Sequence, residues 1–357
     1  MSDGRIDREL NNVTARPEKL LLQEVLENCS RLNIPAHAVL ELTYRCNLRC
    51  RHCYVDAPDT DELTLSEWQG IIDQLKVAGT IYLLMTGGEI MLRPDFLDIA
   101  AYARRNGLIP GFLTNGTLIT PDLARDIAAL KPFSIAVSLY GASPAIHEAI
   151  TQVPGSYERT LDGIRLLISH GLPVLVQTIA MKTNLAELSG IEKLVESLGA
   201  RSSIVMGMAP AKSGADFPLR YEPSTEEIIA SGWRPQNDVS SIGHGPDLCK
   251  AGKGLCSVSP GGDVFPCIMF PLKLGNLKHS KFEVMWRLEP CAELRYLRSM
   301  RRTDLYACVK CDLAVNCQRC TGIAYLESGY LGGPSSSGCR QAETRWRLNQ
   351  TGEVITC

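Results

Sequence analysis

Apolar and polar residues alternate along residues 37–208 in a pattern that predicts strands separated by helices. Short apolar runs with strand character occupy residues 37–42, 81–85, 109–113, 133–139, 174–181 and 202–208. Apolar residues recur with the 3.6-residue period of a helix in segments 66–79, 93–107, 120–131, 157–171 and 185–199. Several of these segments open with Ser, Thr or Asp and close with Gly, as helix caps require. Six strands linked by helices predict an α/β fold whose parallel sheet forms a partial (β/α)6 barrel.

The chain changes character on both sides of this repeating region. Residues 1–36 are polar apart from one amphipathic segment at 19–32, and they predict a helical cap that ends at Pro35. Residues 210–248 are rich in Pro, Gly and Ser, so they predict a linker with one short helix near 224–232.

The part of the chain after residue 248 predicts little regular structure. It contains a hairpin signal with a turn at 260–262 and one convincing helical segment at 281–302. A region so loop-rich is expected to be held together by metal rather than by an apolar core. The predicted divisions are a cap at 1–36, a barrel at 37–209, a linker at 210–248, a metal-binding domain at 249–345 and a tail at 346–357.

Composition limits the class of protein. The 37 Lys and Arg nearly balance the 39 Asp and Glu, and no basic run stands out, so nucleic acid is not an expected partner. No apolar run reaches the ~18 residues of a membrane-spanning helix, and the charged start does not resemble a signal peptide. We therefore expect a cytoplasmic protein that has no membrane partner.

The 14 cysteines are the unusual feature of the composition. Four precede residue 54, ten lie in residues 249–357, and none lies between Cys53 and Cys249. In a reducing compartment, closely spaced cysteines favour metal binding or catalysis over disulfides, so two metal-bearing regions are predicted. Three cysteines fall outside the regular spacings and are expected to be ordinary thiols: Cys29, Cys291 and Cys357.

The first cysteine group, Cys46, Cys50 and Cys53, follows the first predicted strand with the spacing CxxxCxxC. Three thiolates hold three irons of a four-iron cluster and leave the fourth iron open to an outside molecule. Two alternatives remain at this point: a zinc site with His52 as the fourth ligand, or unrelated buried thiols.

The second group lies in CKAGKGLCSVSPGGDVFPC and CVKCDLAVNCQRC and ends with a single later cysteine. Its members are Cys249, Cys256, Cys267, Cys308, Cys311, Cys317, Cys320 and Cys339. Spacing alone fits two zinc-ribbon sites as well as it fits two iron–sulfur clusters.

The CxxxCxxC loop resembles that of the radical S-adenosylmethionine (radical SAM) superfamily, and further motifs follow in the order typical of that family. MTGGEIML resembles its GGE motif, in which Gly87, Gly88 and Glu89 would receive the amino group of S-adenosylmethionine. The family usually has Pro after this Glu, whereas this chain has Ile90.

Two later segments extend the resemblance over residues 37–208. LTNGT places Asn115 at the mouth of the barrel as a further cofactor-binding residue. The segment SLYGASPAIHEAITQVPGSYERTLDGI resembles the family's fourth-strand region, in which Ser138 would contact the cofactor and Arg159 would pair with its carboxylate.

The C-terminal cysteines resemble the SPASM extension of this superfamily, which carries two auxiliary clusters. The resemblance assigns one cluster to Cys249, Cys256, Cys267 and Cys320. It assigns the other to Cys308, Cys311, Cys317 and Cys339. Two residues separate Cys317 from Cys320, whereas the family usually has three, so the assignment departs from the pattern at this point.

The resemblance implies an oxidoreductase with three 4Fe-4S clusters, one of which binds S-adenosylmethionine. Such an enzyme cleaves S-adenosylmethionine reductively to a 5′-deoxyadenosyl radical, which abstracts hydrogen from a substrate. The expected substrate is a ribosomally synthesised precursor peptide that receives a thioether, C–C or C–O crosslink or another oxidative modification. A separate leader-peptide-binding protein and an electron donor such as flavodoxin or ferredoxin are the other expected partners.

Other functions stay open on sequence grounds. They are oxidation of a protein side chain as in sulfatase maturation, oxidation of a sugar or small alcohol, and modification of tetrapyrrole side chains. A zinc-stabilised binding protein is the non-enzymatic alternative, and it would need neither Glu89 nor an open metal position. Four residues are candidates for a general acid or base, and nothing in the sequence separates them: Asp56, Tyr140, His147 and Tyr221.

Overall fold

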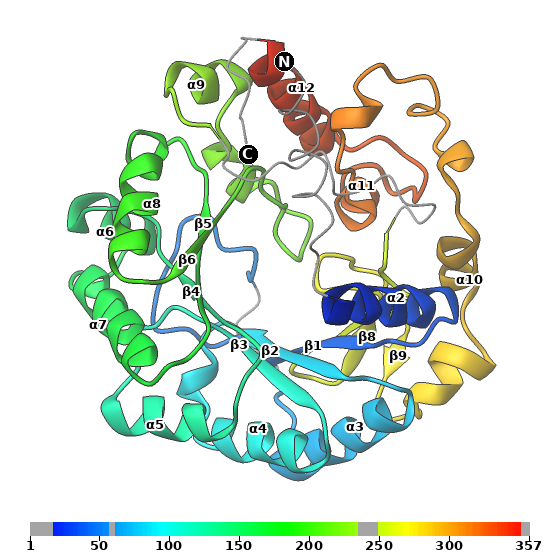
Figure 1. Ribbon diagram of the computed structural model, residues 1–357. Coiled ribbons are helices and arrows are strands. Elements are labelled where there is room, and N and C mark those ends of the chain that lie inside the picture. Colours follow the sequence, from blue (N-terminus) through cyan, green and yellow to red (C-terminus); the bar gives the residue numbers. More distant parts are fainter. Residues whose placement is uncertain (1–16, 57–60, 235–248, 351–357) are drawn as a thin grey trace, which may run out of the picture.

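A curved parallel sheet forms the centre of the protein in a computed structural model that describes residues 17–56, 61–234 and 249–350 (Figure 1). Its first six strands are β1 (His37–Thr43), β2 (Tyr82–Gly87), β3 (Ile109–Thr114), β4 (Ile135–Ser138), β5 (Val174–Ile179) and β6 (Arg201–Val205). Each of these strands pairs in parallel with the next one along the chain. The predicted α/β partial barrel is therefore confirmed.

Helices cover the outside of this curved sheet (Figure 1). They are α3 (Leu65–Val77), α4 (Phe96–Arg105), α5 (Pro121–Ala129), α6 (Pro144–Thr151), α7 (Ser156–Ser169) and α8 (Leu188–Ser197). The expected caps are present, since the side chains of Thr64, Thr120 and Ser143 each accept a hydrogen bond from a backbone N–H of the first turn. Each helix buries its apolar stripe against the strands; in α3 that stripe is Trp68, Ile71, Ile72 and Leu75.

The sequence analysis did not predict α6, although Ser143 followed by Pro144 is a helix-start signal. This helix supports the first cysteine loop. The backbone N–H groups of Arg49 and Arg51 donate to the carbonyl oxygens of Thr151 and Ile150 at distances of 3.0 and 3.1 Å. The end of α6 therefore fixes the backbone between Cys46 and Cys53.

The C-terminal region is less separate from the barrel than predicted. Strand β7 (Leu255–Val258) pairs in parallel with β1 and is followed by β8 (Asp263–Phe265) and β9 (Gly275–Asn276), so the sheet has nine strands within the described residues. Val258, Val264, Phe270 and Trp286 belong to the same buried core as the barrel strands. The expectation that metal replaces an apolar core here is wrong, because β7 continues the main sheet.

The helices of the C-terminal region also differ from the prediction. The expected helix at 281–302 is divided into a π-helical turn at Val284–Leu288 and α10 (Ala292–Ser299), because Pro290 interrupts it. Helices α11 (Thr321–Ser328) and α12 (Ser336–Gln350) were not predicted, and α12 continues through the expected boundary at residue 345.

The N-terminal cap and the linker each contain the expected helix. These are α2 (Pro17–Arg31), which lies beside the C-terminal region, and α9 (Thr225–Ala230), which packs against α12 (Figure 1). Residues 1–16, 57–60, 235–248 and 351–357 lie outside the described part of the chain, and the last of these segments includes Cys357. Among the helices of the described segments, none combines the length and the apolarity that crossing a membrane requires.

Candidate cofactor and cluster site

A cavity of about 490 Å³ lies at the carboxyl ends of the barrel strands. All six strand ends contribute to its wall, through Cys46, Gly88, Asn115, Ser138, Gln177 and Val205 among other residues. The opposite wall comes from the C-terminal region, through Met269, Gln318, Cys320, Ile323 and Gln341. Its position and volume are those expected of a ligand site in this class of fold.

The loop after β1 brings Cys46, Cys50 and Cys53 to the cavity wall. Burial raises the pKa of the Cys50 thiol, and the neighbouring Cys53 and Cys46 raise it further. Within the described residues, no three His, Cys, Asp or Glu side chains are arranged to hold a single metal ion. A four-iron cluster binds each thiolate through a different iron, so its ligands need not converge on one point.

His52 lies between these cysteines and also lines the cavity. Burial lowers its pKa to about 4, so the ring is neutral near pH 7. The ring stands edge-on to Tyr140 with centroids 4.6 Å apart, and its Nδ1 atom has no hydrogen-bond partner among the described residues. The His52 ring therefore adds no charge beside the cysteine loop near pH 7.

The two glycines at the end of β2 hold the start of the cysteine loop. The N–H of Gly88 donates to the Thr43 carbonyl oxygen at 2.7 Å, and the N–H of Glu89 donates to the Arg45 carbonyl oxygen at 2.8 Å. Gly87 has a φ of 147°, which favours glycine, and a Cβ there would overlap the Thr43 carbonyl. A Cβ at Gly88 would overlap the Arg45 carbonyl. Both positions need glycine because two backbone segments touch there.

Glu89 is completely buried and lies behind the residues that line the cavity. Its carboxylate accepts hydrogen bonds from the Asn115 N–H at 2.7 Å, the Thr114 hydroxyl at 2.9 Å and the Met91 N–H at 3.2 Å. Burial raises its pKa, and these hydrogen bonds oppose that effect. Glu89 therefore orients Asn115, whose side-chain amide donates to Asn47 Oδ1 at 2.8 Å.

The structure brings Ser138 to the cavity but not Arg159. Arg159 is exposed on α7, where it donates to the Pro154 carbonyl oxygen at 3.4 Å. The buried neighbour Thr160 instead donates to the Asn115 carbonyl oxygen at 2.9 Å. Sequence reasoning missed Thr160, although it lies on the buried stripe of α7, whereas Arg159 lies on an exposed part of the helix.

Of the four acid–base candidates, only Tyr140 lines the cavity within the described residues. His147 is buried, its Nδ1 accepts a hydrogen bond from the Tyr140 N–H at 3.2 Å, and burial lowers its pKa to about 4. Asp56 accepts hydrogen bonds from Ser213. Tyr221 packs against a small apolar cluster that includes Met208.

The structure brings together the four cysteines Cys249, Cys256, Cys267 and Cys320. Burial raises the pKa of Cys267 to about 12, and Cys249 and Cys320 are close enough to raise it further. Burial likewise raises the pKa of Cys256, with Cys267 as the neighbouring charge. Cys320 also lines the main cavity, so this group reaches the same cavity as the first cysteine loop.

The other four cysteines line a separate cavity of about 110 Å³: Cys308, Cys311, Cys317 and Cys339. Cys317 and Cys320 therefore belong to different groups despite their short separation in the sequence. The departure from the family's usual spacing does not prevent either group from assembling. Cys29 and Cys291 lie outside both cavities.

These arrangements fit the groups that the sequence suggested. Three thiols open onto a cavity that is large enough for a nucleoside-sized ligand. Of the two sets of four thiols, one reaches this cavity through Cys320 alone, and the other lines a separate cavity. Glycine positions allow close backbone approach beside the first set. The donor set thus suits one cluster with an open iron and two clusters with complete cysteine ligation.

Comparison with known sequences supports this reading. The sequence profile of the radical SAM superfamily matches residues 40–195. The profile of the SPASM iron–sulfur cluster-binding domain matches residues 249–321.

Two curated relatives align over most of the chain. The AdoMet-dependent heme synthase of Methanosarcina barkeri is 30% identical over 83% of this chain and 94% of its own length. The mycofactocin maturase MftC of Mycobacterium ulcerans is 28% identical over 85% of this chain and 82% of its own length.

The fold also matches a solved structure, Streptococcus suis SuiB bound to its precursor peptide SuiA. The TM-score is 0.68 at 16% identity, and the match covers 90% of this chain and 81% of that one. The chain belongs to the radical SAM superfamily, as an enzyme that binds S-adenosylmethionine and iron–sulfur clusters and that carries a SPASM domain after its barrel.

Proposed function

We propose that this enzyme oxidatively modifies an uncharged segment of a ribosomally synthesised precursor peptide, and that it installs a thioether, C–C or C–O crosslink or a related modification. The observation that carries the proposal is the chemistry of the 490 Å³ cavity. Among the described residues that line it, none is Asp, Glu, Lys or Arg. A substrate group that enters it is therefore selected by shape and by neutral hydrogen bonds.

Three glutamine side chains, Gln177, Gln318 and Gln341, line the same cavity. Arg345 donates to the Oε1 atoms of Gln318 and Gln341 at 3.0 and 3.3 Å. A carboxamide has two N–H donors and an oxygen that accepts two hydrogen bonds, so it can also pair with a peptide backbone. Apolar side chains such as Met206, Met269 and Ile323 supply the rest of the wall in this region. This combination suits a neutral peptide segment that carries apolar side chains.

We assign the residues of the site as follows. Cys46, Cys50 and Cys53 hold the cluster that binds S-adenosylmethionine, while the two groups of four cysteines hold two auxiliary clusters. Bound S-adenosylmethionine and its cluster supply the radical that abstracts hydrogen. Gly87, Gly88 and Ser138 shape the cofactor's site, and Glu89 acts through Asn115, whose backbone it holds.

The relatives agree with a peptide substrate but also supply a second candidate. MftC is named a maturase and SuiB was solved with a precursor peptide, which favours the peptide. The Methanosarcina relative is named a heme synthase, which favours a tetrapyrrole. Heme carries two propionate groups, and buried carboxylates need cationic partners. The uncharged cavity wall therefore favours the peptide.

We propose three partners, as the family resemblance implies. A precursor peptide is the substrate, a separate small protein binds its leader segment, and flavodoxin or ferredoxin supplies the electron.

The test uses anaerobically purified, cluster-loaded enzyme with S-adenosylmethionine, reductant and the short peptides encoded beside its gene. We expect 5′-deoxyadenosine formation and a peptide that has lost two hydrogen atoms, both measured by mass spectrometry. Tight binding of a tetrapyrrole together with indifference to every peptide would overturn the proposal.

Two variants control the experiment. Replacement of Cys46, Cys50 and Cys53 by Ala should abolish both products and lower the iron content from about twelve to about eight atoms per chain. The matched control is Cys291→Ala, which removes a thiol that lies outside every cysteine group and should change neither product nor iron content.

A further inference from the structure

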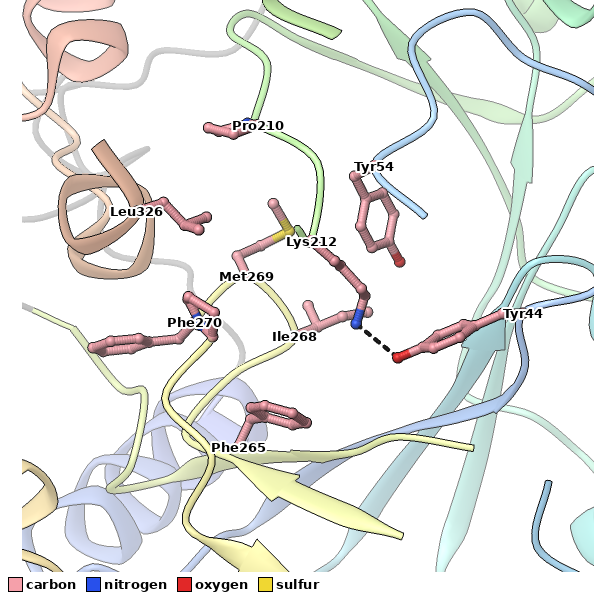
Figure 2. A pocket seen from close by; sticks show the side chains of 10 residues that line it. Tyr44, Tyr54, Pro210, Lys212, Phe265, Ile268, Met269, Phe270 and Leu326 are labelled. Atoms are coloured by element: carbon pink, nitrogen blue, oxygen red, sulfur yellow. Dashed lines mark hydrogen bonds between the residues drawn. The ribbon is translucent and has the colours of Figure 1, made fainter. Parts of the chain in front are cut away.

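A second, smaller cavity has a volume of about 100 Å³ (Figure 2) and adjoins the main one. Tyr54 and Met269 line both cavities, so they form the partition between them. The smaller cavity lies between the first cysteine loop and the C-terminal region. The family resemblance assigned no role to it.

Most of its wall is apolar. Phe265, Ile268, Phe270 and Leu326 surround the space, and Leu326 reaches it from α11 (Figure 2). A cavity of about 150 Å³ lined by apolar side chains holds one benzene molecule. A cavity of 100 Å³ therefore has room for a short side chain and excludes an aromatic one.

Among the described residues that line the two cavities, Lys212 is the only Asp, Glu, Lys or Arg, and it points into the smaller cavity (Figure 2). Its Nζ atom donates to Glu41 Oε2 at 2.6 Å and to the Tyr44 hydroxyl at 3.0 Å. Glu41 is fully buried, and the Tyr44 hydroxyl also donates to it at 3.1 Å. Nζ also lies 5.0 and 5.7 Å from the ring centroids of Tyr44 and Tyr54. The ammonium group has three N–H donors, and its two hydrogen bonds use two of them.

The Glu41 carboxylate compensates the charge of Lys212. A second carboxylate in this place would leave a net negative charge away from water, which is costly. The site therefore offers a hydrogen-bond donor to a neutral oxygen atom, such as a peptide carbonyl or a hydroxyl.

We propose that this cavity is the substrate subsite for the residue next to the one that reacts. It takes an aliphatic or hydroxylated side chain no larger than leucine, and Lys212 donates a hydrogen bond to a neutral oxygen of that residue. The inference rests on the peptide substrate proposed above. The subsite adds a rule of specificity for the neighbouring residue, because Tyr54 and Met269 separate the two cavities and two adjacent substrate residues would occupy one cavity each.

The test is a selection of short random peptides on the anaerobic, cluster-loaded enzyme with S-adenosylmethionine bound. We expect the recovered peptides to share a small aliphatic or hydroxylated residue at one position. Leu326→Phe fills the cavity and should weaken binding of those peptides about tenfold or more, since the peptide side chain can no longer bury its carbon atoms there. Leu326→Ala enlarges the cavity and should recover peptides with a larger side chain at the same position.

The Lys212 contact is tested by replacing both charged residues together, as Glu41→Gln with Lys212→Met, because removal of one partner alone would leave a buried charge. The double variant should bind the selected peptides about tenfold more weakly, which is the expected loss of one hydrogen bond from a charged donor. Leu288→Ala, at a surface position that is 66% exposed, is the matched control and should bind them as the unchanged chain does.

Iron content per chain confirms that each variant is folded and loaded. Recovery of peptides whose preferred residue is the same for both Leu326 variants would overturn the subsite and leave the proposed function standing. Recovery of no peptide by the unchanged enzyme would overturn both.

Discussion

Replacement of Gly88 by Ala tests the contact between β2 and the first cysteine loop. The added Cβ would lie 2.7 Å from the Tyr44 carbonyl oxygen and closer still to that of Arg45. Both are backbone atoms, which cannot rotate out of the way as a side chain can. The cysteine loop must therefore move away from the end of β2.

The size of the effect follows from what that movement disturbs. The hydrogen bonds from Gly88 N–H to Thr43 and from Glu89 N–H to Arg45 both span this contact. Each contributes about 1 kcal/mol, and forced backbone shifts in packed regions typically cost about 1–3 kcal/mol. We expect a total loss of about 3–5 kcal/mol in the free energy of unfolding.

The assay compares thermal unfolding and 5′-deoxyadenosine formation for anaerobically loaded protein. Gly88→Ala should unfold at lower temperature and form little 5′-deoxyadenosine, since displacement of the loop moves Cys46 and its neighbours. Gly70→Ala is the matched control, because Gly70 is exposed within α3 and a Cβ there meets nothing within 4 Å. That substitution should stabilise the protein by about 0.5–1 kcal/mol.

An unfolding midpoint and a 5′-deoxyadenosine yield that both match the unchanged chain would refute the reasoning for Gly88. Equal destabilisation by Gly70→Ala and Gly88→Ala would refute it as well, since the first has no steric conflict.

Three further predictions concern other parts of the site. Arg159→Gln should leave the KM for S-adenosylmethionine unchanged, whereas Thr160→Val should raise this KM severalfold, because it removes the hydrogen bond that holds Asn115. Steady-state 5′-deoxyadenosine formation measures both values. The opposite ranking would restore the role that the resemblance gave to Arg159. Cys320→Ala should lower the iron content by about four atoms per chain, and an unchanged content would contradict its place among the ligands. Burial lowers the pKa of His147 to about 4, so its titration should remove about 3 kcal/mol of stability as the pH falls from 6.5 to about 4. Urea unfolding of His147→Gln should show a loss that is smaller by this amount, and a pH profile identical to that of the unchanged chain would contradict the prediction.

The barrel was predictable because both faces of its sheet are buried. Parallel strands covered by helices appear as continuous apolar runs, and the helices between them keep a regular apolar stripe. The motif residues at the strand ends were identified from the resemblance to the radical SAM superfamily, and each of them follows a strand that the apolar pattern had located. Arg159 was misplaced because a sequence motif does not state which side of α7 faces the barrel.

The C-terminal region was harder to predict because its elements lack these patterns. Strand β7 has only four residues, and α12 is a polar helix that docks on α9 through contacts such as the hydrogen bond between Thr225 and Thr344. Lys212 lies in a stretch whose composition indicates a linker, and its partner Glu41 is 171 positions away in the sequence. Pairing over such distances depends on the tertiary fold.

The parallel pairing of β7 with β1 has a consequence for how the enzyme can be divided. The two family profiles suggest a barrel and an iron–sulfur domain that could be produced separately. Cys256, a residue of one predicted cluster, lies directly beside Ala38 in the first barrel strand. A barrel produced alone would expose the buried edge of β1, and an unpaired edge strand invites aggregation. The boundary drawn by sequence families is therefore not a boundary of folding, and the two parts must be expressed, loaded and engineered as one unit.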